Sequence, residues 1–124
     1  MSRSQVTYTT LMAANAITKN TTEYSDSYDF HGCAGDAALI ITITSSGSPT
    51  FTVSQQCSSN GSDWYDPVNE AGALGGIWTD HVKTAAVYVV FTPVMAHFIR
   101  FTVTETGTAA DGTVSIILIS RLEV

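Results

Sequence analysis

Apolar and polar residues alternate with a period of two along most of this 124-residue chain, which is the pattern of half-buried β-strands. The clearest run is 51–57, and 97–105 and 113–121 repeat the pattern. The first run has one face made of Phe51, Val53, Gln55 and Cys57. No segment keeps a helical period over three turns. The alternation therefore predicts an all-β chain.

Four further segments also have the pattern of strands: Val6–Leu11, Thr21–Phe30, Ala37–Thr44 and 85–91. In the second segment, one face carries Tyr24, Tyr28 and Phe30. The third segment is apolar on both sides near its middle, so we expect it to be a central strand covered on both faces. With seven or eight short strands, the chain is predicted to form a single antiparallel β-sandwich or jelly roll.

The connections between these strands are rich in turn-forming residues. We expect Ser45–Pro49 to close a hairpin between the strands on either side of it, and Thr106–Gly112 to do the same for the last two strands. Ser58–Asp63 is a polar turn in which Asn60-Gly61 can adopt positive φ. Val68–Asp80 contains several glycines and is predicted to be a mobile loop.

The length of the chain is sufficient for one domain with a core and short for two. We divide it into residues 1–20, an N-terminal arm or an edge strand, and residues 21–124, the β-sandwich domain. Both interpretations of the first segment stay open. An arm would pair with a neighbouring molecule and bury Val6, Tyr8 and Leu11 against it.

The charge of the chain argues against nucleic acid as a direct partner. Five Lys and Arg stand against eleven Asp and Glu, so the formal net charge is −6 and the surface repels phosphate backbones. We also expect no membrane association, because no stretch approaches the ~20 apolar residues of a membrane span. The first residues lack the apolar run of a secretory signal, so synthesis in the cytosol is expected.

We expect no catalytic residues, no cofactor and no metal. The histidines and cysteines lack metal-ligand spacing, and the glycine-rich loop matches neither phosphate-binding pattern. No Gly-x-Ser-x-Gly motif occurs, so the chain is not expected to be an enzyme. Asp63 and Asp66 flank Trp64-Tyr65 and are expected to cap turns rather than bind calcium.

Cys33 and Cys57 are predicted to be two free thiols. If 39–44 and 51–57 form a hairpin, Cys57 lies opposite residue 38 or 39, and Cys33 is about 17–20 Å further along. A disulfide needs Cα atoms within about 7 Å.

The aromatic residues around the glycine-rich loop are the main candidates for binding. Trp64 is expected to close one end of the sandwich, whereas the exposure of Trp78 stays open. Arg100 is the one basic residue in a strongly apolar strand, and we expect it to form a structural ion pair with a carboxylate.

Taken in order, three features of the chain resemble small β-sandwich proteins of tailed-phage virions. They are the motif Ser-Asn-Gly-Ser-Asp-Trp-Tyr at 59–65 after a strand, the glycine-rich loop, and the aromatic-rich strand His97–Val103. The resemblance covers roughly residues 20 to 122 in the order and spacing of elements, and it includes capsid decoration proteins and domains of tail and fibre proteins.

This resemblance implies a structural protein on the surface of a virion. A decoration protein binds the outer surface of the major capsid protein shell and stabilises the head, with copies of itself as further partners in a homotrimer. Residues expected to contact a partner are Val6, Tyr8, Leu11, Tyr65 and Trp78. The alternative is a carbohydrate-binding module of a tail or fibre, in which Trp78, Tyr65 and the Gly72–Gly76 loop form the site. A sandwich of another role also stays open.

Overall fold

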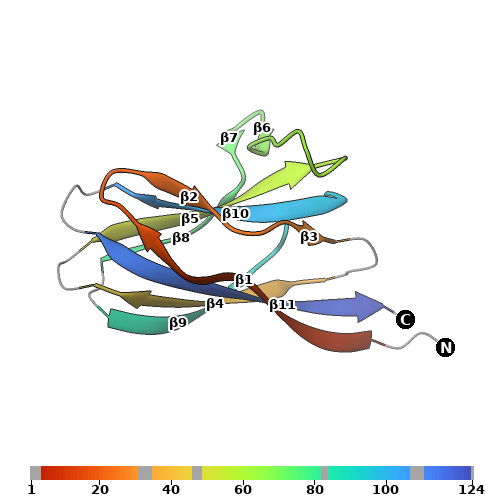
Figure 1. The fold of residues 1–124 in the computed structure, drawn as a ribbon. Helices are drawn as coiled ribbons and strands as arrows, with labels where there is room; N and C mark the ends of the chain where they lie inside the picture. Colours follow the sequence, from red (N-terminus) through yellow and green to blue (C-terminus); the bar gives the residue numbers. More distant parts are fainter. Residues whose placement is uncertain (1–3, 31–34, 46–48, 82–83, 107–110, 124) are drawn as a thin grey trace.

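A computed structural model describes residues 4–30, 35–45, 49–81, 84–106 and 111–123. These residues form eleven β-strands and no helix, and two antiparallel sheets pack face to face (Figure 1). The prediction of an all-β sandwich is therefore confirmed.

Sheet A has four strands, in the order β1 (Ser4–Ile17), β11 (Gly112–Glu123), β4 (Ala37–Thr44) and β9 (Thr84–Phe91). Sheet B has the order β2 (Thr22–Tyr24), β10 (Phe98–Glu105), β5 (Thr50–Ser58) and β8 (Gly76–His81), and β3 (Tyr28–Asp29) also pairs with β10. A small hairpin of β6 (Val68–Asn69) and β7 (Gly72–Ala73) lies on the side of sheet B away from sheet A (Figure 1).

The core lies between the two sheets and uses the alternation seen in the sequence. Sheet B contributes inward side chains from β5 and β10, and sheet A contributes them from β4, β11 and β1. Their buried apolar side chains are Phe51 and Val53 of β5; Ile99, Phe101 and Val103 of β10; Leu39, Ile41 and Ile43 of β4; Val114, Ile116 and Leu118 of β11; and Leu11, Met12 and Ile17 of β1. Strand β4 lies between β11 and β9, as expected of a central strand.

Both predicted hairpins are wrong. Residues 45–49 carry the chain from β4 in sheet A to β5 in sheet B, and residues 106–111 carry it from β10 in sheet B to β11 in sheet A. Strand β4 has β9 on one side and β11 on the other, so no edge of β4 is open to β5. Residues 46–48 and 107–110 lie outside the described part of the chain.

The predicted strand over Thr21–Phe30 is split into β2 and β3. At the break, the Ser25 amide donates to the Phe101 carbonyl, and the Ser25 hydroxyl accepts from the Phe101 amide. The next amide, that of Asp26, donates to the carbonyl of Leu11 in sheet A. Residues 25–27 therefore interrupt the ladder with β10, where three residues stand opposite two, and the expected common face is lost: Tyr24 is exposed, whereas Tyr28 and Phe30 pack on the core.

The glycine-rich segment also differs from its prediction as a mobile loop. Residues 76–81 form β8, which pairs with β5, and the preceding residues form the β6–β7 hairpin. Gly75 lies so close to β5 that a Cβ there would stand 2.5 Å from the carbonyl oxygen of Gln55. The glycine is required for this close approach.

Two buried polar side chains hold the connections between the sheets. The side-chain NH2 group of Gln55 donates to the Val94 backbone carbonyl at 2.9 Å, and its side-chain oxygen accepts from the Val94 backbone amide at 3.0 Å. These two bonds tie the β9–β10 connection to β5. The carboxylate of Glu105 accepts from the amides of Thr50 at 2.9 Å and Asn20 at 3.2 Å. Both side chains supply hydrogen bonds where the strand ladders end.

We predict that Gln55→Leu destabilises the protein by about 1–3 kcal/mol, because the Val94 amide and carbonyl lose their partner in a buried setting. Urea unfolding followed by circular dichroism measures this change. Gln5→Leu is the matched control, since Gln5 is exposed on β1, and its effect should stay within about 0.5 kcal/mol. Equal effects of the two substitutions would contradict the role given to Gln55.

Candidate interaction surface

On the outer face of sheet A, two neighbouring rows of cross-strand residues are apolar except for Thr10. Cross-strand neighbours share one face of a sheet. One row runs Tyr8, Ile119, Ala38 and Val90 over β1, β11, β4 and β9. The next row runs Thr10, Ile117, Ile40 and Tyr88 over the same strands. We call this surface, together with Val6 on β1, the outer patch.

Large apolar side chains of the outer patch face solvent. Their exposed fractions are 54% for Val6, 70% for Tyr8, 61% for Tyr88 and 64% for Val90. An open groove of about 200 Å³ lies on this surface, and Asp36 and Arg121 are among the residues that line it. An apolar surface with a charged rim is the anatomy of a protein–protein interface.

The structure brings two of the five expected partner-binding residues into the outer patch and leaves three outside it. Val6 and Tyr8 belong to the patch, because β1 is an edge strand of sheet A that pairs with β11 from Ser4 to Ile17. Leu11 is buried in the chain's own core, so it offers no surface to a partner.

Tyr65 and Trp78 do not meet in one site. Tyr65 forms a bridge with Cys57, and Trp78 pairs with Val53, four residues away along β5. That separation is about 13 Å at the rise of a strand. Trp78 is half-buried and packs against the core, which answers the question of its exposure, whereas Tyr65 is 65% exposed.

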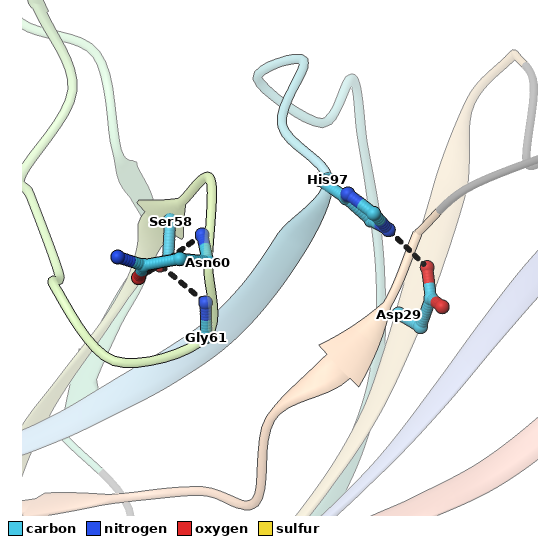
Figure 2. Close-up of polar contacts among 5 residues, drawn as sticks. All are labelled: Asp29, Ser58, Asn60, Gly61 and His97. Atoms are coloured by element: carbon cyan, nitrogen blue, oxygen red, sulfur yellow. Dashed lines mark hydrogen bonds and ion pairs between the residues drawn. The ribbon is translucent and has the colours of Figure 1, made fainter.

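A second exposed region lies where the β9–β10 connection meets the end of β5. Tyr65 and the fully exposed Met95 line an open cleft of about 310 Å³ with Cys57 and His97. Nε2 of His97 lies 3.4 Å from Oδ1 of Asp29, and the imidazole stacks on Phe98 with ring centroids 4.3 Å apart. Figure 2 shows the pair of His97 and Asp29 beside β10.

The polar turn after β5 has the predicted geometry. The Ser58 hydroxyl accepts from the amides of Asn60 and Gly61 (Figure 2), and Gly61 has a φ of +79°. The Asn60 side chain accepts from the amides of Ser62 and Asp63. The carboxylate of Asp63 accepts from the Asn60 side-chain amide and that of Asp66 from the Gln56 side-chain amide, so neither caps the turn backbone as expected.

Arg100 forms a stack with aromatic rings instead of the predicted ion pair. Its guanidinium carbon lies 4.3 Å from the ring centre of Tyr24 and 4.5 Å from that of Trp64, and Nε donates to Gln56 at 2.8 Å. No carboxylate of the described residues lies within ion-pair distance of this guanidinium. Trp64 is therefore held on the outer face of sheet B, and its predicted place at the end of the core is wrong.

Cys57 is a free thiol, whereas Cys33 lies outside the described residues. Burial raises the pKa of the Cys57 thiol above its ordinary value of 9.0, and a hydrogen bond from Gln55 acts in the opposite direction. The hairpin used to predict two free thiols does not exist, so the prediction for Cys33 stays a prediction.

Two findings concern other kinds of site. Within the described ranges, no three His, Cys, Asp or Glu side chains are grouped so that they could hold a metal ion. The same ranges contain no helix that is long and apolar enough to cross a membrane.

Neither the scan against protein-family models nor the comparison with curated proteins finds a match to this chain.

Sequence reasoning missed most of the outer patch, including Tyr88, Val90 and Ile119. A signal was present, because 85–91 and 116–119 are apolar at odd and even positions alike. A strand that is apolar on both faces needs a cover on both. Without the sheet order, however, the strands that share an outer face cannot be identified.

We predict that Arg100→Met lowers the free energy of unfolding by about 1–2 kcal/mol, since the stem stays and the guanidinium between two rings is lost. Denaturant unfolding measures the difference. Arg121→Met is the control, because Arg121 is exposed and no ring stacking is found for it, and a change within about 0.5 kcal/mol is expected. An unchanged stability of Arg100→Met would refute the role of the stack.

We predict that folded Cys57 reacts more slowly with iodoacetamide than the same thiol in the unfolded chain. The thiolate is the reactive form, and the raised pKa lowers its fraction in the folded protein. As the pH rises through the ordinary thiol pKa, the Cys57 thiol ionises in the unfolded chain before it does so in the folded protein. The free energy of unfolding therefore falls over that pH range. A Cys33→Ser background isolates this thiol, and equal alkylation rates in the folded and unfolded states would contradict the prediction.

Proposed function

We propose that this protein is a structural protein of a phage virion, a decoration protein that docks on the outer surface of the major capsid protein shell and stabilises the head. The observation that carries the proposal is the outer patch, whose large apolar side chains on the two edge strands, β1 and β9, are exposed to solvent. The resemblance of 59–65 and 97–103 to virion sandwich proteins supplies the kind of partner.

The geometry of the outer patch suits docking by adhesion. A sheet surface is rigid, because each strand is held by ladders on its neighbours, so little ordering is needed when a partner binds. Tyr8 and Tyr88 are of the aromatic class that dominates binding energy at interfaces. Asp36 and Arg121 at the rim supply charges of both signs for orientation.

Repetition of the protein on a particle strengthens such contacts. Copies that are linked on one particle gain avidity without new contacts, so the contact of each single copy can be weak. The resemblance alone also leads us to propose that the protein associates with further copies of itself as a homotrimer.

The proposal is tested by co-sedimentation with undecorated heads. Wild-type protein is expected to sediment with the heads, and Tyr8→Asp is expected to weaken binding by about 30-fold or more, because a charge replaces an exposed aromatic side chain in the apolar contact. Tyr65→Asp changes a tyrosine of similar exposure outside the outer patch and should bind as wild type does.

Circular dichroism confirms that both variants are folded before binding is compared. If wild-type protein stays in the supernatant, the proposed function is removed. If Tyr65→Asp abolishes binding and Tyr8→Asp leaves it intact, the docking surface is the cleft near Met95 and the outer patch has another role.

A further inference from the structure

Strand β9 is an open edge of sheet A. All eight of its residues pair in register with β4 from Thr84 to Phe91, and the described residues place no strand on its other side. An antiparallel strand directs the amide and carbonyl groups of alternate residues to each side, so about four residues of β9 offer both groups to an additional strand. An edge of this kind is a template for pairing unless something blocks it.

The other three edges are interrupted or short. Strand β1 keeps its register from Ser4 to Thr10, but it is bulged on both sides of Met12 and Ala14 in it has a φ of +50°, so its regular edge ends half-way along the strand. Strand β8 has a bulge near Ile77. The β2–β3 edge is made of two strands of three and two residues. Bulges and short strands are the means by which folded proteins keep edges from pairing.

Strand β9 has none of these devices. Its sequence, Thr-Ala-Ala-Val-Tyr-Val-Val-Phe, contains no charge and no proline, and its register with β4 has no shift. Tyr88 and Val90 are exposed on the outer side, whereas Val87, Val89 and Phe91 are half-buried on the inner side. A strand added to β9 would therefore cover apolar side chains on both faces of the sheet.

We infer that β9 pairs antiparallel with β9 of a second copy of this chain, which joins two sheets A into one continuous sheet. The pairing is isologous, so two segments of equal length satisfy each other and the contact closes at two copies. It is separate from a threefold association, and it does not depend on the docking proposal.

Charge selects the antiparallel arrangement over the parallel one. Asp36 accepts a hydrogen bond at 2.8 Å from the hydroxyl of Thr92, the residue after the end of β9. Antiparallel pairing places the two Asp36 side chains at opposite ends of the shared edge, about 25 Å apart at the rise of a strand. Parallel pairing would set them side by side. Since the Debye length is about 10 Å, the first arrangement avoids their repulsion.

The uncharged edge also suits a partner of the same charge. Each copy carries a net charge of −6, so two copies approach most easily through a strand that has no acidic residue. In the pair, the outer faces of both sheets lie on the same side, and the two outer patches become neighbours across the junction.

The test is the mass of the full chain in solution, without heads, measured by light scattering from about 1 to about 100 µM, a range that spans micromolar affinities. A mass of twice 13.2 kDa is expected at the upper end. Tyr88→Lys with Val90→Lys should return the protein to one copy, because lysine on an edge opposes pairing. Tyr8→Lys changes the same face away from β9 and should leave the pair intact.

Hydrogen exchange of the β9 amides supplies an independent readout. Amides on the open side of β9 should exchange about tenfold or more slowly in the concentrated sample than in the dilute one, and the amides of β1 should not change. A single-copy mass at the highest concentration would overturn the inference. So would a mass of three copies that Tyr88→Lys with Val90→Lys leaves unchanged, which means the homotrimer without β9 pairing. Dissociation by Tyr8→Lys would overturn it as well, because it means contact between faces. Protection of β9 that appears only when heads are added would assign this edge to a different partner.

Discussion

The structure depends on the packing of the inner faces of the two sheets. Each strand has only two faces, so the choice of residues that enter the core also decides which ones face outward. Phe51 and Val53 in sheet B meet Leu39 and Ile116 of sheet A in a single buried cluster. Every outward residue in the account, from Arg100 to Val90, owes its place to this constraint.

Because of this constraint, the apolar side chains of the outer patch on sheet A have no place in the core. A sheet with one wet face normally has polar residues there, and sheet B follows this rule with Thr52, Thr79 and Thr104. Sheet A departs from it, because Tyr8, Tyr88 and Val90 project from the same face. Exposed apolar side chains of this kind have a cost in solubility, and the proposed docking would give them a physical purpose.

The sequence allowed most of the long strands to be predicted, because period-two alternation is a local property. Alternation places Phe51, Val53 and Gln55 on one face of 51–57, and all three are buried. The pairing itself could not be predicted: Ser45–Pro49 has the composition of a turn, and turn composition does not reveal whether the chain returns to the same sheet or crosses to the other. The split at Ser25 was hidden for a similar reason, since its hydroxyl replaces a strand contact with Phe101, far along the chain.

The candidate site was predictable only in part. Val6 and Tyr8 were recognised from their own strand, whereas Tyr88 joins them only through the order β1–β11–β4–β9. Arg100 was recognised as unusual in its strand, but its stack needs Tyr24 and Trp64 from two other parts of the chain. Long-range contacts of this kind are set by topology, which local patterns do not carry.

The most direct test of the account is hydroxyl-radical footprinting of the protein, free and on particles, read at single residues by mass spectrometry. The account predicts that Tyr8 and Tyr88 are labelled in the free protein and protected on the particle, while Tyr65 and Met95 remain labelled in both. Protection of Tyr65 and Met95 with continued labelling of Tyr8 and Tyr88 would contradict it.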